Sequence, residues 1–444
     1  MSAKTHVLVV GGGGREHAFV ESIAKSPDLA FLHAAPGNAG MAQSATCHDV
    51  AADDVKGLVA LAKRLEIGLV VVGPEAPLVA GLVDALRAEG IPTLGPTRAA
   101  AELEGSKAFT KELCRRARIP TAAYKTFNDA SEALAYVDSL ERWPSVVKAD
   151  GLAGGKGVVI CEDKQTATDV IRDAMLNAHF GAAGDRLVIE DFLVGEELSL
   201  IALVDGETIA VLESSRDHKA AFDGDTGPNT GGMGAFSPSR LLRNRLYNQI
   251  EERILIPTVH TMAKEGRPFT GILYAGLMVT EEGPEVLEFN VRGGDPEMQV
   301  LMPRLKSDAL GLFLATANGD LEGHGPAQWT EQSACGIVLA DGGYPTTTTP
   351  GQEIHGIEDA AALSDVSVFH AGTKMQGKQL VTAGGRVLCV TALGETLALA
   401  QKRAYEAVGH IEFEGMRFRS DIGWRELGPR PSAEPQAEPS VEPS

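Results

Sequence analysis

Several features are scarce in this chain of 444 residues. The five cysteines are odd in number and lack Cys-x-x-Cys spacing, which argues against a disulfide framework or a zinc site. No apolar run approaches the roughly 20 residues of a membrane helix, and no charged leader with an apolar signal core precedes the first apolar run. These absences predict a soluble, cytoplasmic protein with reduced thiols.

Basic residues are also in deficit. The chain has 40 Lys and Arg against 60 Asp and Glu, and its formal net charge is −20. This excess of negative charge disfavours non-specific binding to nucleic acid or to anionic membranes. A phosphorylated small substrate remains compatible, because local lysines, arginines and backbone N–H groups are enough to build an anion site.

The first hundred residues alternate short apolar runs with helical patterns. His6–Val10 and Leu69–Val72 are strand candidates, and a helix is expected from Glu16. Strands that alternate with helices predict an α/β fold with a parallel sheet. Each of the two strands runs into a glycine-bearing loop, at the sheet edge where such folds bind ligands.

The rest of the chain is expected to form further, different units, because its length exceeds what one hydrophobic core supports. A 25-residue loop without structure inside a domain is unusual unless it serves a site. The expected segments are a helix at Ser106–Ile119, a small α/β unit at 120–195 with a strand at Ser145–Lys148, a β-rich unit at 196–300 interrupted by a glycine-rich loop at 214–238, an α+β unit at 334–427 with strands at Gly336–Ala340 and Arg386–Thr391, and a disordered Pro/Glu/Ser tail after Gly428.

The first glycine loop, Gly11–Gly14, joins a strand to a helix, so its backbone can approach an anion at the helix N-terminus. It does not have dinucleotide-binding spacing, because Glu16 occupies the position of the final glycine. The next apolar run, Leu29–Ala35, also ends without the acid that would hold a ribose. A phosphate or phosphoribosyl site is favoured, and a plain tight turn is the alternative.

A second glycine-rich stretch follows the strand that carries Lys148. It differs from a P-loop because Asp150 stands at the first glycine position and Gly157 stands where Ser or Thr binds magnesium. An apolar strand follows the loop instead of a helix. The pattern is typical of a flexible hairpin that closes over a polyphosphate with Lys148 and Lys156, although an ordinary glycine hairpin with solvated lysines fits equally well.

The stretch Glu285–Arg292 gives the strongest argument from residues alone. Residues two apart share a face of a strand, so Glu288, Asn290 and Arg292 should project together, with Leu287, Phe289 and Val291 in the core. Hard oxygen ligands suit Mg²⁺, and an arginine beside them can hold a carboxylate. The alternative is a half-exposed strand with a polar face. The acidic turn Gly293–Glu297 at the strand end favours the metal site.

Two further stretches carry weaker signals. The apolar strand that starts at Leu187 ends in acids, and it could offer adenine its backbone and a ribose the side chain of Glu197. The loop at 214–238 gathers cations, an acid and glycines, so it could order over a bound substrate. His218 within it is expected to be structural more than a general base.

Taken in order, these motifs resemble the phosphoribosylamine–glycine ligases of the ATP-grasp superfamily. The matching stretches run from residue 11 to residue 424 and leave only the tail uncovered. They are GGGGREHA, APGNAG, VGPEAPLVAG, LEGSKAFTK, KADGLAGGKGV, DHK with DTGPNTGGMGA, LYAGLM, EFNVRGGDPE, FHAGTK, GGRVLCVTALG and DIGW.

The resemblance implies a multidomain α/β and α+β architecture. Its parts are an N-terminal substrate domain with a parallel sheet at 1–105, an ATP-grasp domain at 106–330 whose small flap lobe spans about 122–192, a C-terminal α+β domain at 331–427 and a disordered tail at 428–444.

The resemblance also implies the activity and the role of each site residue. Glycine would be ligated to 5-phosphoribosylamine through glycyl phosphate, with ATP as co-substrate and Mg²⁺, or alternatively Mn²⁺, as cofactor, in purine synthesis. No nucleic acid or membrane partner is implied, and a monomer is allowed. The residues carried over are Lys107, Lys148, Gly154, Gly155, Lys156, Glu190, Phe192, Leu193 and Glu197 for ATP; Glu288 and Asn290 for the metal; Gly11, Gly12, Gly13, Gly14, Asn38, Gly73, Pro74 and Glu75 for phosphoribosylamine; and Asp217, Lys219, Arg292 and Asp295 for glycine and the acyl phosphate.

Two departures from the family pattern lie next to the expected substrate arginine. Val291 replaces a small residue and should be tolerated, because it faces the core. Gly293 replaces an aromatic residue, which puts local contacts and substrate affinity in question. Alternative functions are another ATP-grasp carboxylate–amine ligase, a nucleotide-sensing protein and, least favoured, an NAD-dependent oxidoreductase.

Overall fold

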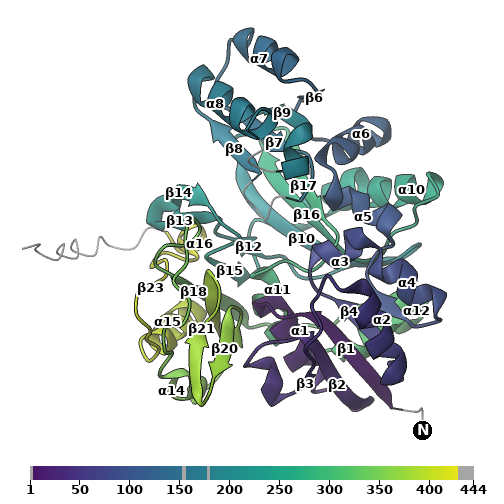
Figure 1. Cartoon of the computed structure of the whole chain (residues 1–444), viewed down its shortest axis with the longest axis vertical. Coiled ribbons are helices and arrows are strands. Elements are labelled where there is room, and N and C mark those ends of the chain that lie inside the picture. Colours follow the sequence, from purple (N-terminus) through teal and green to yellow (C-terminus); the bar gives the residue numbers. More distant parts are fainter. Residues whose placement is uncertain (1–3, 153–156, 178–180, 429–444) are drawn as a thin grey trace, which may run out of the picture.

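The computed structural model describes residues 4–152, 157–177 and 181–428. Figure 1 shows an N-terminal part at the lower right, a lobe projecting at the top, a central sheet between them and a C-terminal part at the lower left. Within the described residues, no helix is both long and apolar enough to cross a membrane.

The N-terminal part is a parallel sheet in the order β3-β2-β1-β4-β5, as the alternating pattern predicts. Its central strands are continuous apolar runs because helices cover both faces. Helix α1 begins at Gly14 and not at Glu16, since the Gly13 N–H is capped by the Glu16 carboxylate. The elements are β1 (Thr5–Gly11), α1 (Gly14–Ile23), β2 (Leu29–Pro36), β3 (Thr46–Cys47), α2 (Val55–Arg64), β4 (Leu69–Val72), α3 (Glu75–Ala80), α4 (Leu82–Ala88), β5 (Thr93–Leu94) and α5 (Arg98–Gly105).

The central sheet is antiparallel, in the order β11-β10-β16-β17. Its apolar face shares one continuous core with the N-terminal sheet and helices, through residues such as Val72, Leu198 and Phe289. The two parts are therefore packed as one body. The elements are α6 (Lys107–Ala117), β10 (Glu196–Asp205), β11 (Ile209–Val211), α9 (Asn244–Ile250), α10 (Ile256–Lys264), β16 (Thr270–Thr280), β17 (Gly283–Asn290), α11 (Glu297–Leu301), α12 (Ala309–Asn318) and α13 (Leu321–His324).

The projecting lobe has a core of its own, formed by residues such as Phe127, Val137 and Ile171. Its antiparallel sheet has the order β6-β9-β7-β8, and β7 and β8 form the expected hairpin with Lys148 opposite Val158. The predicted flap residues Gly154, Gly155 and Lys156 lie outside the described residues. The elements are β6 (Tyr124–Phe127), α7 (Ala130–Asp138), β7 (Ser145–Ala149), β8 (Val158–Cys161), α8 (Lys164–Met175) and β9 (Leu187–Asp191).

The loop predicted at 214–238 is not without structure. Its two ends, 214–221 and 232–237, are mostly buried, so their backbone polar groups need partners, and the segment forms short strands that pair with one another and with the C-terminal sheet. The strands are β12 (Arg216–Asp217), β13 (Ala220–Phe222), β14 (Thr226–Asn229) and β15 (Gly234–Ser237). This segment therefore fastens the C-terminal part to the centre of the molecule.

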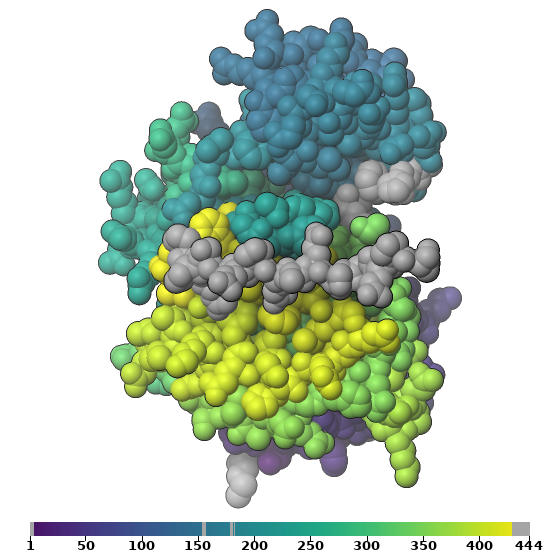
Figure 2. Space-filling view, turned by 90° about the vertical axis from the view of Figure 1, so that its left-hand side faces the viewer, coloured from purple at the N-terminus to yellow at the C-terminus, as the bar shows by residue number. Residues whose placement is uncertain are grey.

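The C-terminal part continues that sheet in the order β12-β15-β18-β22-β19. Figure 2 shows it, in yellow, as a broad body below the projecting lobe in blue, with the teal β13–β14 region between them. Residues 429–444, where a disordered tail is predicted, lie outside the described residues. The elements are β18 (Ser333–Asp341), α14 (Ile357–Ala361), β19 (Val366–His370), β20 (Thr373–Gln376), β21 (Gln379–Thr382), β22 (Arg386–Gly394), α15 (Leu397–Val408), β23 (Met416–Arg417) and α16 (Trp424–Leu427).

Candidate active site

A cavity of about 310 Å³ lies where the projecting lobe, the central sheet and the N-terminal part meet. Twelve of the residues predicted for ATP, metal, glycine and the acyl phosphate line it, together with Glu75 from the N-terminal part. The predicted residues in its wall are Glu75, Lys107, Lys148, Glu190, Phe192, Leu193, Glu197, Asp217, Lys219, Glu288, Asn290, Arg292 and Asp295.

Strand β17 brings the predicted metal ligands together. The Asn290 amide nitrogen lies 3.4 Å from a Glu288 carboxylate oxygen, and the Asn290 oxygen accepts from Arg292 Nη2 at 2.9 Å. The prediction that Leu287 faces the core is wrong. A bulge at this point of the β16–β17 ladder places Val286 and Phe289 in the core, and Leu287 lines the cavity.

Lys107, Lys148 and Lys219, from three different segments of the chain, all act on Glu288 of this strand. Lys107 at the start of α6 donates to the Gly151 carbonyl at 2.9 Å, and Lys148 on β7 donates to the Leu287 carbonyl at 3.0 Å. Burial acts to raise the pKa of Glu288, but Lys219, Lys148 and Lys107 outweigh it and hold that pKa below its usual range. Burial lowers the pKa of Lys107. The site therefore keeps Glu288 ionised among cations that suit a polyphosphate.

Lys148 also belongs to a buried group that the sequence interpretation missed. Glu190 lies between Lys148 Nζ at 3.0 Å and Lys111 Nζ at 2.9 Å, and all three side chains are less than 10% exposed. Glu190, which was expected to bind ATP, is thus placed to hold Lys148. Lys111 stands one helical turn after Lys107 on α6, a spacing that could have identified it.

Arg292 is fixed by acids from two other elements. Its Nη2 lies 2.9 Å from Glu104 at the end of α5, and its Nε lies 3.4 Å from Glu75 at the start of α3. Burial acts to lower the pKa of Arg292, and the neighbouring Glu104 and Glu75 raise it well above its ordinary value. The guanidinium is permanently charged and oriented. Glu104 was not identified from the sequence.

The predicted pair Asp217 and Lys219 lines the same cavity. Lys219 Nζ contacts Glu197 at 3.0 Å and Asp217 at 3.1 Å. Burial raises the pKa of Asp217, and burial with the nearby Asp217 raises that of Glu297 to about 7. Glu297 accepts from the Tyr274 hydroxyl at 2.9 Å. His218, which stands between Asp217 and Lys219 in the sequence, is buried and accepts a hydrogen bond from the Gly423 N–H at 3.1 Å. This contact is a structural role.

The residues predicted for phosphoribosylamine, apart from Glu75, lie beside this cavity. Both glycine loops wrap around the side chain of Glu16: its carboxylate accepts the Gly13 N–H at 2.6 Å, and a Cβ at Gly73 would collide with it. Gly11, at φ +119°, passes between Glu16 and Pro74. Glycine is needed at these positions because the Glu16 carboxylate fills the loops.

Asn38 uses its whole amide within the protein. It donates to the carbonyls of Gly12 and His370 at 2.9 and 2.8 Å, and it accepts from the N–H groups of Gly40 and Met41 at 3.0 and 2.9 Å. It thus ties the first glycine loop to the C-terminal part and supports the loop's shape.

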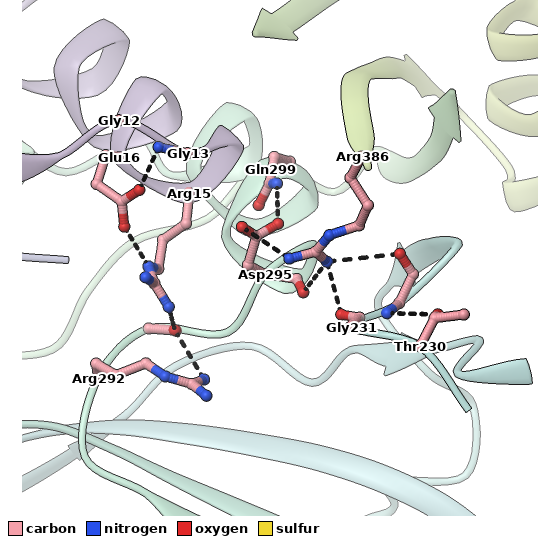
Figure 3. A network of polar contacts seen from close by, with 12 residues as sticks. Gly12, Gly13, Arg15, Glu16, Thr230, Gly231, Arg292, Asp295, Gln299 and Arg386 are labelled. Atoms are coloured by element: carbon pink, nitrogen blue, oxygen red, sulfur yellow. Dashed lines mark hydrogen bonds and ion pairs between the residues drawn. The ribbon is translucent and has the colours of Figure 1, made fainter. Parts of the chain in front are cut away.

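The turn that follows β17 is held from two sides, as Figure 3 shows. Arg15 of α1 donates to the Gly293 carbonyl at 2.9 Å, and Arg292 donates to the same oxygen at 3.2 Å. Asp295 pairs with Arg386 of β22 at 3.2 Å and accepts from Gln299 at 2.6 Å. The turn therefore depends on residues of the N-terminal and C-terminal parts, which local sequence patterns do not reveal.

Gly293 leaves no empty space where an aromatic side chain was expected. A Cβ there would lie 2.8 Å from Met298, 2.9 Å from Phe19 and 3.2 Å from Arg15. The neighbouring side chains already fill the position, so the glycine brings no loss of local contact. Val291 is buried in the core, as expected.

Comparison with known families agrees with this layout. Three models of phosphoribosylglycinamide synthetase match the chain: the N domain at residues 5–104, the ATP-grasp (A) domain at 105–298 and the C domain at 334–425. The chain belongs to the phosphoribosylglycinamide synthetase family. A phosphoribosylamine–glycine ligase of Caulobacter vibrioides is 51% identical over 428 residues, which cover 96% of this chain and 100% of that protein.

Solved structures give the same result at the level of the fold. The phosphoribosylamine–glycine ligase of Thermotoga maritima has a TM-score of 0.84 and 32% identity, covering 94% of this chain and 100% of that one. The biotin carboxylase domain of a Hydrogenobacter thermophilus 2-oxoglutarate carboxylase, solved with ADP, magnesium and bicarbonate, has a TM-score of 0.71 at 18% identity and shows the shared fold alone.

Proposed function

We propose that this member of the synthetase family ligates glycine to 5-phosphoribosylamine, with conversion of ATP to ADP and phosphate, in purine synthesis. The observation that carries the proposal is one cavity in which Glu288 and Asn290 face Lys107 and Lys148, with Glu75 of the N-terminal part in the same wall. A nucleotide and a substrate held by the N-terminal loops would meet there.

The residues present fit a divalent cation that is bound mainly by a nucleotide. Among the described residues, no three or more His, Cys, Asp or Glu side chains are arranged to hold a metal by themselves. Mg²⁺ is commonly held by one or two protein oxygens together with phosphates and water, and Glu288 with Asn290 supply such a pair once the Asn290 amide, whose oxygen accepts from Arg292, turns toward Glu288. When bound, the cation would neutralise phosphoryl charge. We propose Mg²⁺ as the natural metal, with Mn²⁺ as a substitute.

Activation of glycine is the first chemical step that these residues support. A carboxylate does not condense with an amine at neutral pH, because hydroxide is a poor leaving group. The glycine carboxylate attacks the γ-phosphate of ATP and gives glycyl phosphate and ADP, while Lys107 and Lys148 stabilise the charge on the transferred group. Arg292, held by Glu104 and Glu75, orients the carboxylate beside the nucleotide.

Amide formation is the second step. The phosphoribosylamine nitrogen attacks the acyl carbon, phosphate leaves and the nitrogen loses a proton. No nucleophilic side chain is needed, since the walls position the reactants. We assign Asp217, Lys219 and Asp295 to this side of the cavity, and Gly11–Gly14 with Gly73 and Pro74 to the phosphoribosyl group. Phe192, Leu193 and Glu197, at the entry to β10, are assigned to the nucleoside.

The wider features of the proposal follow from the same family. We propose domains at 1–105, 106–330 and 331–427, with the small lobe at about 122–192. All five cysteines are free thiols, which suits a reducing cytoplasmic location. We propose that the protein acts as a monomer.

The test is ADP release that depends on both glycine and phosphoribosylamine, the latter formed in the assay from ribose 5-phosphate and ammonia. We expect ADP and glycinamide ribonucleotide in equal amounts, and little ADP when alanine, formate or bicarbonate replaces glycine. Faster turnover with one of these acids would assign the chain to another carboxylate–amine ligation, and tight ATP binding without turnover would indicate a nucleotide sensor.

A further inference from the structure

We propose that Arg386 of the C-terminal part is a positioning residue for the ligation: it fastens two walls of the cavity together and keeps water from glycyl phosphate until the amine attacks. The inference rests on the proposed function and adds a residue to it. Arg386 itself is not in the cavity wall among the described residues; it acts through groups that are.

The contacts of the guanidinium define the fastening. Arg386 Nη1 donates to the Gly231 carbonyl at 2.6 Å and to the Asp295 carbonyl at 2.7 Å, and Nη2 lies 3.2 Å from the Asp295 carboxylate. Figure 3 shows the side chain between these two segments. Nη1 thus bonds a carbonyl of each segment while Nη2 pairs with the Asp295 carboxylate, whereas a lysine would have one nitrogen for all three acceptors.

Both segments are parts of the cavity wall. Asn229, Thr230 and Gly231 line it on one side, and Asp295 lines it beside them. The two walls touch directly, since a Cβ at Gly232 would collide with Pro296. Tyr344, also from the C-terminal part, accepts the Gly231 N–H at 2.9 Å. The C-terminal part therefore holds a closed seam in the cavity.

The position of the seam matters for the second step of the reaction. Asp295 Oδ2 lies 3.5 Å from where a Cβ of Gly13 would be, so the seam faces the first glycine loop, where the phosphoribosyl group is assigned. An open seam would admit water on the side from which the amine must come. The water oxygen would then bond to the acyl carbon as the bond to phosphate breaks, giving back glycine with phosphate and a proton.

The two fates of glycyl phosphate are separated by counting products. Productive turnover gives one ADP per glycinamide ribonucleotide, whereas each hydrolysis adds one ADP without product. We would purify the full-length wild type with Arg386→Gln, Arg386→Lys and a control, Arg403→Gln. Arg403, on α15 of the same part, pairs with Asp365 at 2.8 Å. It does not line the cavity.

For Arg386→Gln we expect the ratio of ADP to product to rise at least about twofold, because excluded water is what protects the intermediate. ADP release with glycine alone should rise as well, and KM for ATP should stay within about twofold, since the metal and lysine side is untouched. Arg386→Lys should lie between, because one ammonium nitrogen on a shorter side chain has to serve the three acceptors that two guanidinium nitrogens share. Arg403→Gln should keep the wild-type ratio.

A ratio of one for both Arg386 variants overturns the inference, whether kcat is retained or falls, because a purely structural arginine lowers kcat without uncoupling. If Arg386→Gln does not fold, Arg386→Lys decides by the same ratio. A wild-type chain that releases no ADP with glycine and phosphoribosylamine instead overturns the proposed function, and this inference with it.

Discussion

The buried group Lys111–Glu190–Lys148 allows a prediction with a magnitude. Two ammonium groups lie 2.9 and 3.0 Å from one carboxylate, and all three side chains are less than 10% exposed. Removal of one partner from a buried ion pair costs about 3–5 kcal/mol, because it leaves an uncompensated charge. Glu190→Gln leaves two buried like charges, so it should lower the free energy of unfolding by the upper end of this range, about 5 kcal/mol. Lys111→Met leaves one balanced pair and should cost about 3 kcal/mol.

The combination of the two changes gives the sharper test. With glutamine at position 190, Lys111→Met removes one of two facing ammonium groups and should be neutral or stabilising. The coupling free energy between the two sites should therefore be about 3 kcal/mol. Urea unfolding of the wild type, both single variants and the double variant, followed by circular dichroism, measures it. Lys56→Met, an exposed lysine on α2, is the control and should stay within about 0.5 kcal/mol.

If the change in unfolding free energy of the double variant equals the sum of the two single changes within about 0.5 kcal/mol, the reasoning is refuted. Such additivity is what residues that do not interact show. The same variants also report on ATP. In Lys111→Met the carboxylate of Glu190 has Lys148 as its remaining partner, so Lys148 should be held away from phosphate and KM for ATP should rise about tenfold, or 1.4 kcal/mol.

Three further predictions concern the metal site, the turn and acid stability. Glu288→Gln should lower glycine-dependent ADP release at least about 100-fold, because several kcal/mol of charge stabilisation depend on the cation. The control Glu285→Gln, on the same strand, should release ADP at the wild-type rate. Equal rates for the two variants would contradict the metal assignment. Gly293→Ala should lower unfolding stability by about 1–3 kcal/mol by displacing Met298 and Phe19, and an unchanged urea midpoint would contradict the crowding. Burial lowers the pKa of His218 to about 3, so the folded chain keeps it neutral while the unfolded chain protonates it below about 6.5. Stability should therefore fall by about 2 kcal/mol from this group as the pH drops from 6.5 to 5, and His218→Gln should reduce that fall in urea titrations at the two pH values.

Local patterns predict much of the fold because the physics of these segments is local. The runs that became β1 and β4 are apolar throughout, since helices cover both faces of a parallel sheet. Ser106 caps α6, with its side chain accepting the Phe109 N–H, as the helix-start signal predicts. The two-residue period of β17 likewise brings Glu288 and Asn290 to one side.

Predictions failed where the structure depends on partners distant in the chain. The bulge that turns Leu287 toward the cavity depends on the pairing of β17 with β16, which the sequence of β17 does not encode by itself. The loop at 214–238 forms strands because β15 pairs with β18, which lies about a hundred residues later in the chain. Arg386 stands at the start of an ordinary strand, and only the folded chain shows that it reaches Asp295 and Gly231.

The turn at residues 292–296 explains why these distant partners matter for function. A turn at the end of a strand, left to itself, opens readily because few contacts hold its backbone. Here the Gly293 carbonyl is bonded to an arginine of the N-terminal part and the Asp295 carbonyl to one of the C-terminal part. The same turn carries Arg292 and Asp295 into the cavity. The geometry of the two charged groups is therefore set by the central sheet, the N-terminal part and the C-terminal part together, so a change in the N-terminal or C-terminal part should alter the ligation before it alters binding of the nucleotide.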